Sequence, residues 1–144
     1  FKNWGLAVEN LAKFSQKKGA KVIIQTPTPE WEKQHRNPRC STLDKQWFNS
    51  LAKINCQIES KFFIDKETGL YNHLFEKLNQ LSGSYENLYL FDTYKIVCPK
   101  SICSFTVDGI DIYQDHQHIM HRWARDFIAP KFSKFIFNIQ TMDK

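Results

Sequence analysis

The chain has 144 residues, a net charge of +5 at neutral pH, 42% hydrophobic residues and 24% charged residues. This length and composition suit one globular domain with a sizeable core. No apolar run is long enough to span a membrane, and the basic residues are scattered singly or in pairs, so we expect neither a membrane span within these residues nor a nucleic-acid partner.

The first predicted elements are a helix and a buried strand. Residues 2–18 carry apolar side chains at helical spacing on one face, namely Trp4, Val8, Leu11 and Phe14, and Gly19 stands where a helix often ends. The short β-branched run 21–26 (KVIIQT) is typical of a parallel strand with both faces covered. Because the chain begins at Phe1 rather than Met, inside the predicted helix, we expect it to be a piece of a longer polypeptide.

Three further elements are predicted in the middle of the chain. Residues 42–60 have the most regular helical pattern, formed by Leu43, Trp47, Leu51, Ile54 and Ile58. Residues 60–65 are either a short strand or a loop. A second helix, marked by Leu74, Leu78 and Leu81, ends at 82–84 (SGS), and residues 87–92 (NLYLFD) read as a second buried strand.

The last predicted element is a helix that Pro130 interrupts or kinks. Its apolar face consists of Ile119, Trp123, Phe127, Ile128, Phe132 and Phe135. Helices alternating with buried strands indicate an α/β fold with a parallel sheet covered on both faces. Ligands of such sheets bind beyond the carboxyl ends of the strands, where the segments 25–31 (QTPTPEW) and 91–97 (FDTYKIV) begin.

The four cysteines lack the C-x-x-C spacing of zinc and redox motifs. Cys98 and Cys103 bracket a short loop whose ends can approach within disulfide distance, so we predict a bridge between them. Cys40 and Cys56 should not pair with each other, since a continuous helix between them would hold them about 24 Å apart. A disulfide favours an oxidising compartment.

The segment 115–118 (DHQH) combines an aspartate with two histidines. A carboxylate three positions before an imidazole can accept a hydrogen bond from one ring nitrogen and fix the ring, as in the supporting part of a serine-nucleophile apparatus. Asp115 and His118 are therefore the candidate catalytic pair. A metal site made by His116, His118 and His121, with or without Asp115, is a weaker alternative, because metal ligands usually come from well-spaced elements or include cysteines. The histidines could also simply cap and solvate the last helix.

Three blocks in order carry a family resemblance: KGAKVIIQTPTP, NLYLFDTYKIVCPKSIC and GIDIYQDHQHI. Together they resemble the C-terminal part of an SGNH-type hydrolase/acyltransferase domain, in the version fused to membrane-embedded acyltransferase-3 (AT3) proteins. The resemblance implies a three-layer α/β/α, flavodoxin-like fold with a mainly parallel sheet, of which residues 1–144 are the C-terminal portion and the N-terminal part is missing.

The resemblance also implies roles for individual residues. Asp115 resembles the aspartate of the family's catalytic triad and His118 its base. The family's Gly-Asp-Ser nucleophile block has no counterpart here, since Gly83-Ser84 stands in the wrong order and lacks the aspartate. Either the serine lies upstream of Phe1, or the protein is a degenerate relative.

The implied activity is transfer of an acyl group, with acetyl expected, to or from carbohydrate hydroxyls through a serine ester. It requires no cofactor and no metal. The implied partners are a glycan, to which Trp31 would contribute, and a membrane acyltransferase domain in the same polypeptide. The implied location is periplasmic or extracytoplasmic. A non-catalytic glycan-binding or assembly module and a soluble esterase remain as alternatives.

Overall fold

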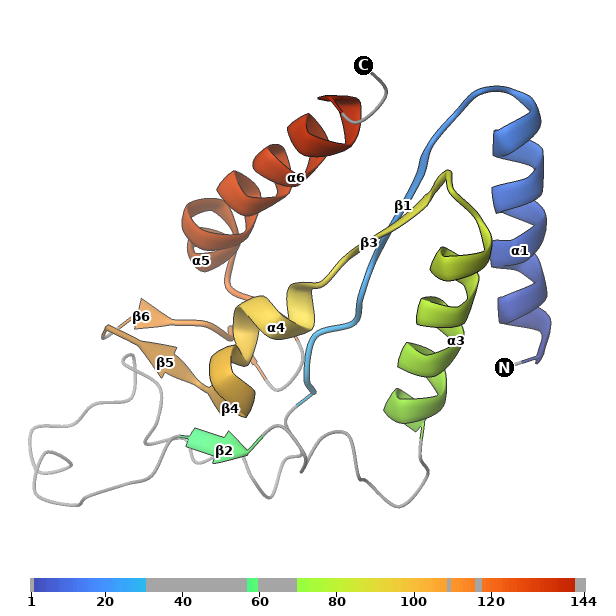
Figure 1. Ribbon diagram of the computed structural model, residues 1–144. Helices are drawn as coiled ribbons and strands as arrows, with labels where there is room; N and C mark the ends of the chain where they lie inside the picture. Colours follow the sequence, from blue (N-terminus) through green and yellow to red (C-terminus); the bar gives the residue numbers. More distant parts are fainter. Residues whose placement is uncertain (1, 31–56, 60–69, 109, 116–117, 142–144) are drawn as a thin grey trace, which may run out of the picture. The chain divides into compact units, whose positions relative to one another are not determined.

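The computed structural model describes residues 2–30, 57–59, 70–108, 110–115 and 118–141 (Figure 1). The chain divides into two compact units: Phe1–Pro27 with Ile64–Asp92, and Thr28–Phe63 with Thr93–Lys144. Within the described ranges, no helix has the length and apolar character that a membrane crossing requires. The chain has a mixed α/β structure with a small parallel sheet.

The first unit is built around a pair of parallel strands. β1 (Val22–Gln25) lies beside β3 (Leu88–Phe91), in a register that runs from Val22 opposite Leu88 to Gln25 opposite Phe91. The helices α1 (Lys2–Lys17) and α3 (Leu70–Ser84) contact each other and the strands (Figure 1). Both strands were predicted from their short apolar runs, and their parallel pairing is confirmed.

The buried side of α1 differs from the apolar face expected from its sequence. Val8 is buried as expected, but its buried neighbours on the helix are the small residues Gly5, Ala12 and Ser15. The larger apolar side chains Trp4, Leu11 and Phe14 are exposed. Small residues allow close approach: a Cβ on Gly5 would lie 3.1 Å from the Lys77 side chain of α3.

Polar side chains tie α1 to the segment that leads into β3. The Asn87 amide donates hydrogen bonds to the carbonyls of Ala12 and Ala20. Glu9 accepts hydrogen bonds from Lys13, at 2.7 Å, and from the Tyr85 hydroxyl, at 3.1 Å. The bond from Lys13, and after it the bond from Tyr85, lowers the pKa of the Glu9 carboxyl below its ordinary value of 4.5.

The second unit contains short antiparallel strands that the sequence did not indicate. β2 (Gln57–Glu59) pairs with β4 (Ile102–Ser104), and β5 (Thr106–Val107) pairs with β6 (Ile110–Asp111). The helix predicted over residues 42–60 is therefore wrong at its end, because a backbone paired in a ladder cannot also be helical there. Residues 42–56 lie outside the described part of the chain.

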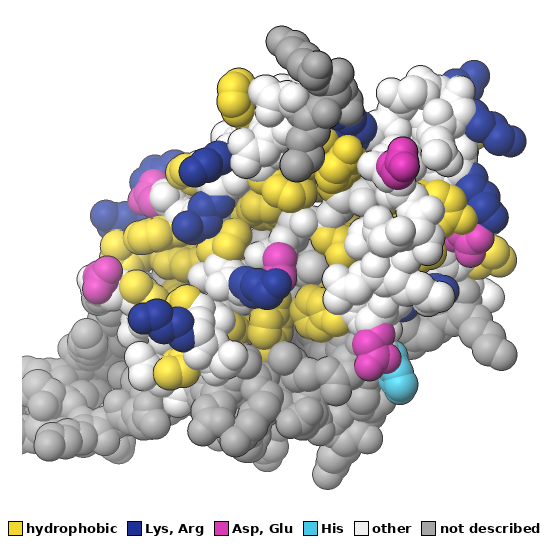
Figure 2. Space-filling model, in the orientation of Figure 1, with side chains coloured by type: hydrophobic (Ala, Val, Ile, Leu, Met, Phe, Trp, Pro, Cys, Tyr) yellow, Lys and Arg dark blue, Asp and Glu magenta, His cyan; other side chains and the backbone are white. Residues whose placement is uncertain are grey.

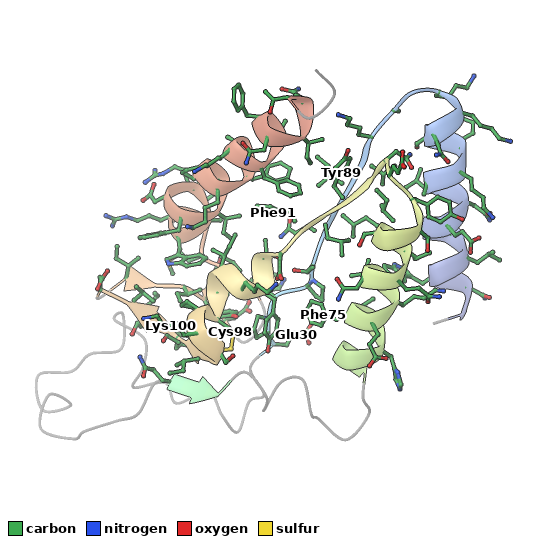
Figure 3. All side chains as sticks on the ribbon, viewed as in Figure 1. Glu30, Phe75, Tyr89, Phe91, Cys98 and Lys100 are labelled. Atoms are coloured by element: carbon green, nitrogen blue, oxygen red, sulfur yellow. A yellow bond between two sulfur atoms is a disulfide. The ribbon has the colours of Figure 1, made fainter. Side chains whose placement is uncertain are left out.

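The predicted disulfide between Cys98 and Cys103 is present, and both cysteines are buried. It closes the loop between α4 (Thr93–Val97) and β4, which contains the 3₁₀ turn Pro99–Ser101 (Figure 3). Lys100 and Ser101 in this loop both have positive φ angles, 53° and 62°, a conformation that is unfavourable for residues with a side chain. The covalent bridge holds this tight loop closed. Cys40 and Cys56 lie outside the described residues.

Pro130 does not break the last helix. The chain passes from α5 (His121–Trp123) through a π-helical turn, Ala124–Ile128, into α6 (Ala129–Thr141). In the π-helical turn the Ala129 N–H donates to the Ala124 carbonyl, five residues back. The widened turn immediately before Pro130 accommodates a residue that has no N–H and whose ring would crowd a regular α-helical turn.

Acid should remove the stabilisation that Glu9 contributes to the first unit. Because its pKa is lowered in the folded chain, this contribution is present above pH 4.5 and is lost as the pH falls through the folded value. Urea unfolding at pH 7 and pH 3 should show a smaller acid-induced loss of stability for Glu9→Gln than for the wild type. Glu86→Gln, at an exposed carboxyl, is the matched control; an equal acid response in Glu9→Gln and the wild type would contradict the assignment.

Removing the disulfide should destabilise the second unit. For a loop as short as Cys98–Cys103, constraint of the unfolded chain accounts for about 2 kcal/mol. The double variant Cys98→Ala/Cys103→Ala should lose about this much in urea unfolding followed by circular dichroism. Reducing the Cys98–Cys103 bridge of the wild type with a thiol should lower its stability by a similar amount, and the double variant should not show this loss. Equal stability of variant and wild type under oxidising conditions would show that the bridge contributes nothing.

Candidate active site

Asp115 and His118 lie on a closed backbone turn between β6 and α5. The Met120 N–H donates to the Ile112 carbonyl at 2.7 Å, and the Gln114 N–H donates to the His118 carbonyl at 2.8 Å. Tyr113 and Ile119 face each other in an antiparallel bridge between these two bonds. The two arms of the turn are thus paired as in a hairpin, and the Asp–His segment forms its tip.

The Asp115 carboxylate accepts two hydrogen bonds from the same residue. Oδ1 lies 2.8 Å from the His118 backbone nitrogen, and Oδ2 lies 2.7 Å from His118 Nδ1. The first bond closes a local side-chain-to-backbone turn, which fixes the position of the carboxylate. The second fixes the orientation of the imidazole. The pairing expected from the D-x-x-H spacing is therefore present.

This geometry determines which ring nitrogen can act as a base. An ionised carboxylate only accepts hydrogen bonds, so the proton of the neutral imidazole resides on Nδ1, and Nε2 carries the lone pair. The His118 side chain is 66% exposed and the Asp115 side chain 35% exposed. Nε2 is therefore accessible to a reacting group from outside the turn. Because water reaches the pair, it screens the electrostatic attraction between Asp115 and His118. The main effect of the carboxylate is therefore to orient the imidazole.

The turn is attached to the core of the second unit through the residues before it. The Ile112 N–H donates to the Phe105 carbonyl, the Phe105 and Tyr113 rings stack with centroids 5.7 Å apart, and the Tyr113 hydroxyl donates to the Pro29 carbonyl at 2.9 Å. Phe105, Ile112 and Tyr113 are almost completely buried. The sequence pattern assigned no role to Tyr113, which stands two positions before Asp115 in the block GIDIYQDHQHI.

The segments expected at the carboxyl ends of the parallel strands begin there. The Thr26 N–H donates to the Phe91 carbonyl at 3.0 Å, and the Thr26 hydroxyl lies 3.4 Å from Asp92 Oδ1. Thr26 and Asp92 thus adjoin each other directly after β1 and β3. This edge belongs to the first unit, whereas the Asp–His turn belongs to the second.

The remaining candidates are placed only in part. Trp31 and His116 lie outside the described residues, and His121 is exposed at the start of α5. Within the described part of the chain, no three potential metal ligands come together. On the face shown in Figure 2, Lys and Arg side chains are spread over several elements.

A model of the SGNH domain, in the form fused to AT3 domains, matches residues 3–132 of the chain. No curated protein and no solved structure gives a significant match. The matched residues include the parallel strands, the disulfide loop and the Asp115–His118 turn. The chain belongs to the family of SGNH domains that are fused to AT3 acyltransferase domains.

Proposed function

We propose that the chain carries the base and the orienting acid of an SGNH-type esterase or acyltransferase site. The single observation that supports this most is the hydrogen bond between Asp115 Oδ2 and His118 Nδ1, which leaves Nε2 accessible. An imidazole held in this tautomer can take the proton of a serine hydroxyl as the oxygen attacks an acyl carbonyl. Family membership adds the reaction class, which is chemistry on acyl esters.

The proposed reaction has two balanced steps. In the first, His118 Nε2 accepts the serine proton, the serine oxygen bonds to the acyl carbon, and the resulting imidazolium protonates the departing alcohol. In the second, the imidazole takes a proton from water or from an acceptor hydroxyl, whose oxygen attacks the serine ester, and the proton returns to the serine. Asp115 keeps the ring oriented and stabilises the imidazolium throughout.

The serine is proposed to come from a Gly-Asp-Ser block upstream of Phe1, because the sequence contains no such block. The complete domain would then be a three-layer α/β/α, flavodoxin-like fold, with residues 1–144 as its C-terminal portion and further parallel strands beside β1 and β3. The exposed apolar side chains of α1 are compatible with additional packing of this kind.

The proposed substrates are acyl esters, with acetyl preferred, of carbohydrate hydroxyls. The disulfide Cys98–Cys103 is typical of oxidising compartments, which supports a periplasmic or other extracytoplasmic location. Fusion to an AT3 domain, as in the family, would tether the domain to the membrane and place it beside a supply of acyl groups. The alternative is a non-catalytic glycan-binding or assembly module, in which case the full protein would contain no Gly-Asp-Ser block.

Replacing His118 with Ala in the intact protein should lower the rate of ester hydrolysis at least about a hundredfold, because general acid–base catalysis supplies this much or more. Hydrolysis of p-nitrophenyl acetate and labelling by a fluorophosphonate measure turnover and serine activation separately. His121→Ala, at an exposed histidine on α5, is the matched control. Equal activity in His118→Ala and His121→Ala would remove the proposed base, and an inactive wild type that binds glycan would favour the binding module.

Replacing Asp115 with Asn should lower kcat on the order of a hundredfold, while KM changes little. The amide can donate as well as accept, so it no longer enforces the tautomer with a proton on Nδ1. Asp108→Asn is a suitable control, because Asp108 is exposed and its positive φ of 50° is one that Asn tolerates. An Asp115→Asn variant with wild-type kcat would show that the carboxylate does not orient a catalytic imidazole.

A further inference from the structure

Tyr113 is held inside the second unit through its hydroxyl, its ring and its backbone. Its side chain is only 1% exposed, and its hydroxyl donates a buried hydrogen bond to the Pro29 carbonyl at 2.9 Å. Its ring stacks on Phe105, with the planes inclined at 28°. Its backbone is bridged to Ile119 across the base of the Asp–His turn. Side chain and backbone together leave Tyr113 little freedom to move.

These contacts bear directly on the geometry of the turn. Tyr113 precedes Asp115 by two residues, and its bridge partner Ile119 follows His118 immediately. Both ends of the Asp–His segment therefore leave from the one backbone pair that Tyr113 anchors. The His118 side chain is 66% exposed, so its position depends strongly on the backbone and the carboxylate that hold it. Rotation of Tyr113 would carry the carboxylate and the imidazole with it.

The Tyr113 hydroxyl donates to the carbonyl of a buried residue, Pro29. Pro29 is fully buried and lies in the short segment that follows β1 along the chain. A carbonyl of a buried residue that loses its donor is left unsatisfied, which makes displacement of either group unfavourable. The hydroxyl therefore links the Asp–His turn to the segment after β1, a link between residues far apart in the sequence.

We propose that Tyr113 is a positioning residue for His118: its hydroxyl holds the base of the turn on Pro29 and so fixes where Nε2 points. This inference rests on the proposed function, because it gives Tyr113 an effect on catalysis through His118. A purely structural role would lower stability alone. A positioning role also lowers kcat in protein that is fully folded, since a small displacement of a reacting group greatly reduces the rate.

The test compares three variants in the intact protein at a temperature where each is folded, as checked by thermal melting. Tyr113→Phe removes only the hydroxyl and keeps the stacked ring. Phe105→Leu removes the aromatic ring that stacks on Tyr113 and leaves the Tyr113 hydroxyl in place. It replaces Tyr113→Phe in the test if Tyr113→Phe fails to fold. Tyr85→Phe removes a tyrosine hydrogen bond, to Glu9, in the other unit and is the matched control.

With p-nitrophenyl acetate, Tyr113→Phe should show kcat reduced roughly tenfold with KM nearly unchanged, while Tyr85→Phe keeps both. Independently of activity, the His118 Nδ1 proton should be seen by NMR in the wild type and lost through faster exchange in Tyr113→Phe. Wild-type kcat and an intact Nδ1 resonance in folded Tyr113→Phe would overturn the inference. If His118→Ala is inactive in that same series, the proposed function survives; if His118→Ala is fully active, the proposed function fails instead.

Discussion

The hydrogen bond between Asp115 and His118 is the interaction on which the functional account depends. An imidazole on an exposed turn would otherwise sample many orientations and two neutral tautomers. The carboxylate removes much of this freedom, because one of its oxygens is fixed to the His118 backbone and the other holds Nδ1. The imidazole is ordered before any substrate binds. The entropy lost in orienting it is therefore lost on folding and does not add to the activation barrier.

The turn keeps this geometry because the residues on either side of it are fixed. The antiparallel bridge closes its base, while Phe105 and Tyr113 anchor the base in a buried cluster. The disulfide lies on the strand leading into this cluster, since Cys103 belongs to β4 and Phe105 follows that strand directly. An exposed reactive group on a rigid, buried support is a common arrangement for catalytic loops.

The features that could be predicted from the sequence were those that depend on local spacing. Short apolar runs predicted both parallel strands, the short loop between Cys98 and Cys103 predicted the disulfide, and the D-x-x-H spacing predicted the Asp115–His118 contact. Features set by tertiary packing were missed. The buried side of α1 contains Gly5 and Ala12, whose small size lets neighbouring elements approach the helix closely. The largest apolar residues of the helix lie on its exposed side. The strand at Gln57–Glu59 depends on a partner more than forty residues away, as the register with Ile102–Ser104 shows.

The most direct measurement of the central claim is the ¹⁵N NMR spectrum of the His118 ring at a pH where the ring is neutral. The account predicts a protonated Nδ1 and an unprotonated Nε2, because the Asp115 carboxylate accepts from Nδ1. A ring that carries its proton on Nε2, or that averages freely between the two tautomers, would contradict the account.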